Sequence, residues 1–127
     1  MNKFATVLTS IGIALFFSTG VVLADDGAIQ TMARITMNLN HFPSDDDKAE
    51  LQGIIDSDDA NEEEADIAMA IANIEHKIQE KDVERLQDII DDDSTGANAR
   101  ELASILLRIN HTPSDDDKAA LAALTAK

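Results

Sequence analysis

The chain has 127 residues, with 25 Asp and Glu against 10 Lys and Arg, and a formal net charge of −15 at pH 7. So acidic a surface repels phosphates and anionic lipid heads, which excludes nucleic acid and membrane surfaces as partners. There is no cysteine, Trp or Tyr, so disulfides are excluded and the core must be aliphatic. The length suits one small domain.

The first 24 residues have the pattern of a secretory signal peptide. Lys3 gives a basic head, an uncharged run extends from Phe4 to Leu23, and the sequence ending at Ala24 suits cleavage. The alternative is an uncleaved membrane anchor, because about 20 uncharged residues can span a bilayer. Cleavage would leave a domain of residues 25–127 with a net charge of −16, located in the periplasm or outside the cell, with no membrane attachment.

A ten-residue sequence occurs twice, 70 residues apart. Asn40–Ala49 returns as Asn110–Ala119 with nine of ten positions identical, and a degraded copy, Glu75–Glu84, lies midway. The chain is therefore a tandem repeat of period 35. The repeat places a histidine at the same position in each copy: His41, His76 and His111.

Each copy predicts a turn between two helices. Pro43 disfavours helix at the preceding residue, Ser44 can cap the next helix, and Asp47 can complete a capping box. The third copy repeats this pattern. The middle copy has Ile78 and Gln79 instead of proline and serine, which predicts a looser or partly continuous joint.

Apolar residues follow the helical spacing on both sides of the turn. In the first helix of the three copies they are Met32, Ile35, Thr36 and Leu39; Ile67, Ala70, Ile71 and Ile74; and Leu102, Ile105, Leu106 and Ile109. In the second helix they are Leu51, Ile54 and Ile55; Leu86, Ile89 and Ile90; and Leu121 and Leu124.

This spacing predicts an all-α fold of three helical hairpins, about six helices, with repeat units near 27–61, 62–96 and 97–127. Short helices of this kind bury their apolar faces only against neighbouring hairpins. The hairpins can form a short open array or a compact bundle, and three units favour the compact form.

Acidic joints connect the copies. Asn61 and Gly96 occupy equivalent positions in them, where a left-handed backbone beyond a helix C-terminus is expected. The second joint partly matches an EF-hand calcium loop. Its weak candidate ligands are Asp91, Asp93, Thr95 and Glu101, but Leu102 stands where a bidentate Glu is needed. The alternative is a solvated run of charges with helix caps.

The three histidines are candidates for a metal site or a pH sensor. The competing interpretation places each in the last turn of a first helix, bonded to free carbonyls. Helices of neighbouring hairpins would separate the histidines by roughly 10 Å, too far to share one ion. We therefore predict no metal site and no cofactor.

The sequence favours an exported, non-enzymatic protein that binds another protein, possibly a basic one. Phosphate loops, metalloprotease motifs and cysteine nucleophiles are absent. The alternatives are a weak divalent-cation buffer, using the acidic joints, and a structural protein of the cell envelope. The sharpest candidate surface is the repeated turn: His41, Ser44, Asp45, Asp46, His111, Ser114, Asp115 and Asp116.

Overall fold

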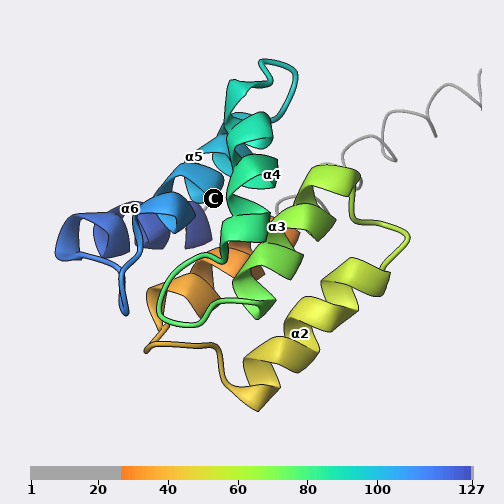
Figure 1. Ribbon diagram of the computed structural model, residues 1–127. Coiled ribbons are helices and arrows are strands. Elements are labelled where there is room, and N and C mark those ends of the chain that lie inside the picture. Colours follow the sequence, from red (N-terminus) through yellow and green to blue (C-terminus); the bar gives the residue numbers. More distant parts are fainter. Residues whose placement is uncertain (1–26, 127) are drawn as a thin grey trace, which may run out of the picture.

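The computed structural model describes residues 27–126, which form six helices and no β-strand (Figure 1). The first helix covers residues 27–37. It is followed by α2 (Asp45–Asp56), α3 (Glu62–Ala72), α4 (Glu80–Asp91), α5 (Ala97–Arg108) and α6 (Asp115–Thr125). The predicted all-α fold is confirmed, whereas the predicted signal peptide lies outside the described residues. No helix in the described part is long and apolar enough to cross a membrane.

The apolar residues predicted to face the core do so. All twelve positions of the first-helix stripe are buried, and Met32, Ile67 and Leu102 are fully enclosed. The second helices bury Leu51, Leu86 and their equivalents, whereas Ile54, Ile55 and Ile90 pack only partly against the core. The first helices of the three repeats are therefore the inner layer, and the second helices cover them.

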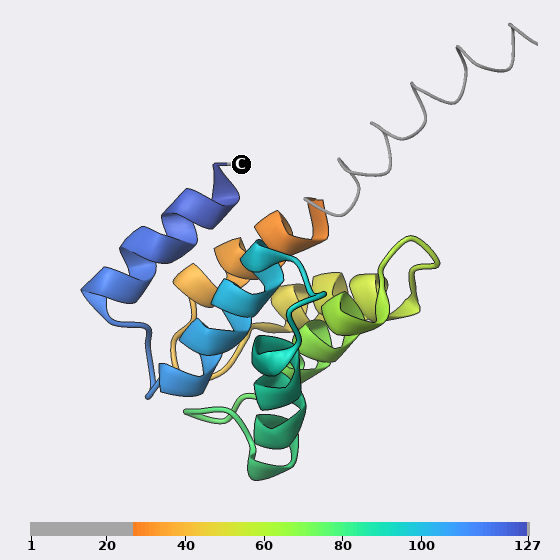
Figure 2. The same cartoon turned by 90° about the horizontal axis from the view of Figure 1, so that it is seen from above.

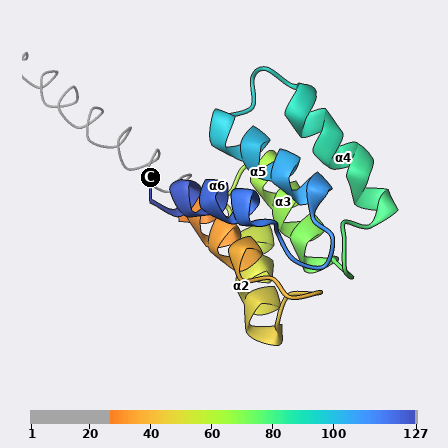
Figure 3. The same ribbon diagram turned by 90° about the vertical axis from the view of Figure 1, so that its left-hand side faces the viewer.

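The packing runs from each repeat into the next. Helix α2 packs most extensively on α3, and α4 on α5. Helix α6 lies beside the first helix, drawn in orange in Figures 2 and 3. Each outer helix therefore covers the inner helix of the following repeat, and the last outer helix covers the first inner one. The bundle is compact and closed on itself, as the three-unit length favoured.

Two local expectations are wrong. Asn61 and Gly96 have φ values of −83° and −58° and stand at the N-caps of α3 and α5, not in left-handed geometry. The Asn61 side chain accepts from the Glu64 backbone N–H in a full capping box. The middle joint is not continuous, because α3 ends at Ala72 and α4 begins at Glu80, although Gln79 makes no side-chain cap there.

Candidate metal site

The backbone of all three histidines has positive φ. The values are 73° for His41, 74° for His76 and 74° for His111, and no other residue in the described part has positive φ. Residues other than glycine rarely adopt this region, and it costs roughly 1–2 kcal/mol each. At the first turn the N–H of Phe42 donates to the carbonyl of Asn40 at 2.8 Å, the pattern of a γ-turn. The histidines thus lie in sharp turns beyond the helices, not in a last helical turn as expected.

These turns are joined in a closed ring of backbone hydrogen bonds. The N–H of His41 donates to the carbonyl of His111 at 2.8 Å. The N–H of His76 donates to the carbonyl of His41, and that of His111 to the carbonyl of His76, each at 2.6 Å. The N–H of each histidine therefore donates to the carbonyl of the equivalent histidine in another repeat, and the three bonds close around an approximate threefold axis. In Figure 3 the three turns gather at the right-hand side of the molecule.

The ring of backbone bonds brings the three imidazoles together. Their centroids lie 5.1 Å apart for His41 and His76, 5.0 Å for His41 and His111, and 4.8 Å for His76 and His111. The first two pairs meet edge to face. The expected separation of roughly 10 Å is therefore wrong. That expectation assumed that the hairpins stack side by side, separated by a helix-packing distance. The turns instead converge on the axis, beyond the ends of the helices, where that distance does not apply.

The geometry of the cluster suits one transition-metal ion. One ring nitrogen from each histidine lies within 4.8 Å of the other two. Three nitrogens at about 2.0–2.1 Å from a tetrahedral ion are about 3.3–3.4 Å apart, so side-chain rotations closing about 1.5 Å or less complete the site. No other group of three or more His or carboxylate side chains in residues 27–126 meets this condition.

A hydrogen bond orients one of the rings. Nδ1 of His41 lies 2.7 Å from Oδ1 of Asn40. An amide oxygen only accepts, so this contact favours the tautomer with the proton on Nδ1, which leaves the lone pair of Nε2 for a ligand. Metal-bound histidines commonly have such a partner on the nitrogen that does not bind the metal.

The surroundings favour a cation. The three inner helices all run toward the turns, so their C-terminal ends, which carry partial negative charge, point to the cluster. The net charge of −15 adds to this field. His41 is half-buried, and His76 and His111 are exposed, so an ion can enter from solvent without a conformational opening.

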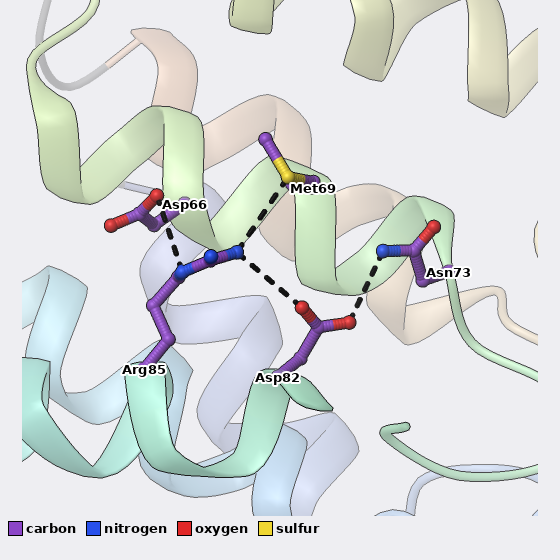
Figure 4. A network of polar contacts seen from close by, with 5 residues as sticks. All are labelled: Asp66, Met69, Asn73, Asp82 and Arg85. Atoms are coloured by element: carbon purple, nitrogen blue, oxygen red, sulfur yellow. Dashed lines mark hydrogen bonds and ion pairs between the residues drawn. The ribbon is translucent and has the colours of Figure 1, made fainter. Parts of the chain in front are cut away.

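A buried carboxylate fixes the middle turn, where no proline or serine is present. Asp82, only 1% exposed, accepts from Nδ2 of Asn73 at the end of α3 at 3.2 Å and pairs with Arg85 at 3.5 Å (Figure 4). Arg85 also pairs with Asp66 at 3.7 Å and donates to the sulfur of Met69. Burial raises the pKa of Asp66, while Arg85 acts in the opposite direction. Asp82 therefore ties the two ends of the turn that carries His76.

The acidic candidates do not converge. Asp91 ends α4, Glu101 lies on the exposed side of α5, and the Asp93 side chain is 98% exposed and pairs with Arg100 at 3.6 Å. Thr95 instead points inward, with its hydroxyl buried and unbonded. Nearby, hydrogen bonds from Ser94 lower the pKa of Asp92. These residues form no common site in the described part of the chain.

The predicted interaction residues have two different environments. His41 and His111 belong to the cluster, whereas Ser44 and Ser114 cap α2 and α6 by accepting from the backbone N–H three residues on. Four exposed aspartates occupy the first turns of these helices: Asp45, Asp46, Asp115 and Asp116. Sequence reasoning included His76 in the repeat but omitted it from the interaction surface, because the turn around it is degraded. The equal spacing of the three histidines along the sequence is the signal that points to His76 as the third member of the cluster.

Comparison with protein-family models, curated proteins and solved structures gives no match to this chain.

Proposed function

We propose that this protein binds a divalent transition-metal ion through His41, His76 and His111. The observation that supports this most is the meeting of three imidazoles from three repeats within 4.8 Å. Three imidazole nitrogens and no thiolate suit Zn²⁺, Ni²⁺, Cu²⁺ or Co²⁺, whereas Ca²⁺ and Mg²⁺ prefer oxygen ligands. As part of the same proposal, the signal peptide expected at residues 1–24 places this function in the cell envelope or outside the cell.

The strained backbone supports a role for these side chains. The left-handed geometry is easier for glycine or asparagine than for histidine. A turn selected for shape alone would favour those residues at one of the three positions. Strain of this kind is retained mainly where function depends on the residue. A tandem repeat also copies residues that have no function, so the recurrence of histidine alone does not establish a metal site. The decisive test is a measurement of metal binding.

The test is calorimetric titration of the purified protein with Zn²⁺ and with Ca²⁺ in physiological salt. We expect one Zn²⁺ per chain with a dissociation constant in the micromolar range or below. His76→Asn removes an imidazole while tolerating positive φ, and it should weaken Zn²⁺ binding by about 100-fold or more, since three ligands are needed to hold the ion.

The matched control is Asp93→Asn, which changes an exposed carboxylate in the second acidic joint. It should leave Zn²⁺ affinity unchanged. Similar affinities for Zn²⁺ and Ca²⁺, with several ions per chain and no effect of His76→Asn, would show nonspecific binding to carboxylates and contradict the proposal.

A further inference from the structure

A groove of about 630 Å³ runs alongside the histidine cluster. His76 forms part of its wall, together with Phe42 from the neighbouring turn, which is 59% exposed. Lys48 from α2 and Lys81 from α4 also line it, as does the carboxylate of Glu75. The groove therefore collects two positive charges beside one of the three proposed metal ligands.

These lysines, like Lys77 and Lys118, differ from the arginines. Each of the four arginines in residues 27–126 pairs with a carboxylate: Arg34, Arg85, Arg100 and Arg108. Neither the Lys48 nor the Lys81 side chain forms an ion pair or a hydrogen bond within the described part of the chain, although the protein carries 25 acidic residues. Their ammonium groups thus remain available to an external anion.

The repeat shows that Lys81 is a local departure. The equivalent positions in the other two repeats are Asp46 and Asp116. An acidic residue is favoured there, because the first turn of a helix has partial positive charge. Lysine at this position in α4 opposes the helix dipole, so helix stability does not account for it. The histidine cluster is threefold, whereas the positively charged groove occurs on one side of it.

We propose that this groove binds a small carboxylate that completes the coordination of the histidine-bound metal. This inference rests on the proposed metal site. Three histidines leave at least one position of a tetrahedral ion open. A carboxylate oxygen bound there places the rest of the anion beside His76, where Lys48 and Lys81 neutralise its charge and Phe42 contacts its apolar part.

The test uses Co²⁺ as the metal and acetate as the anion, because the visible spectrum of Co²⁺ reports its coordination. Co²⁺ is first titrated into the protein, and acetate is then titrated into the loaded protein. We expect acetate to change the spectrum with half-saturation at millimolar concentration. Replacing both lysines, Lys48→Gln with Lys81→Gln, should raise that concentration about fivefold or more, as expected for two partly solvated charge contacts. Co²⁺ affinity should stay within about twofold.

Lys118→Gln is the matched control. Lys118 is the repeat equivalent of Lys48 and does not line the groove, so its replacement should leave acetate binding unchanged. Lys81→Asp, which installs the residue of the other repeats, should fold normally and also lose acetate affinity.

The outcomes separate the two proposals. Failure of Co²⁺ to bind overturns both of them. Co²⁺ binding without an acetate response, or an equal response in the double-lysine variant, overturns only the carboxylate site.

Discussion

The two ends of the bundle use their polar residues in opposite ways. At one end three turns meet on the axis and bring ring nitrogens of three histidines within 4.8 Å of one another. At the other end the acidic joints, residues 57–61 and 92–96, stand well apart at the right and the top of Figure 1. Most of the acidic charge is therefore spread out, and the convergent cluster is built from three imidazoles. The difference shows that side chains come together where turns converge, and not where the sequence holds most acidic residues.

The largest expected effect concerns the packing beneath the histidine end. Ile74, 1% exposed, directly precedes the turn that carries His76. Ile74→Ala should cost roughly 2–4 kcal/mol through lost burial and a residual cavity, which would lower the melting temperature by about ten degrees or more. Ile55→Ala, at a half-buried site near the first acidic joint, should cost clearly less. Equal losses in thermal unfolding would mean that the two ends are packed alike.

Metal should stabilise the protein through the histidine end. The three histidines come from three repeats, so an ion that binds them favours only the folded chain. At a Zn²⁺ concentration 100 times the dissociation constant the gain is about 2.7 kcal/mol, a rise in melting temperature of about ten degrees. His111→Asn should abolish most of that rise without unfolding the metal-free protein. A rise that persists in this variant would place the ion elsewhere.

The carboxylate that holds the middle turn should matter more than its equivalent in the first repeat. Asp82→Ala leaves Asn73 and Arg85 without their shared acceptor and should cost about 1.5–3 kcal/mol. Asp47→Ala removes part of an exposed cap and should cost about 0.5–1 kcal/mol. Urea unfolding of the two variants checks the ranking. A reversed order would show that the buried network does not hold the His76 turn.

The smallest effects should come from the acidic joints. Millimolar Ca²⁺ and Mg²⁺ should give small and similar rises in melting temperature, because each relieves general repulsion. Added monovalent salt should largely erase both rises by screening. Asp93→Asn should change these shifts little, since its side chain faces solvent. A Ca²⁺ dissociation constant at or below about ten micromolar, with much weaker Mg²⁺ binding and loss on Asp93→Asn, would instead establish a selective calcium site.

Much of the fold could be predicted from the sequence. The helical spacing identified the buried faces of the inner helices, because periodicity of 3.6 residues directly records which side meets the core. The serine caps at Ser44 and Ser114 followed from local chemistry. The sharp middle turn did not, because its stabilising residue, Asp82, depends on Asn73 and Arg85 across the turn. That network is tertiary, and Ile78 and Gln79 give no local sign of it.

The sequence by itself determined the repeat, the all-helical class, the strongly acidic charge and the equal spacing of the three histidines. Only the tertiary structure decided that those histidines meet. The reason is that a period of 35 residues sets how often a turn recurs, not whether successive turns lie side by side or around an axis. The turns lie around an axis because α6 packs beside the first helix and closes the bundle. A ring of backbone hydrogen bonds then joins His41, His76 and His111.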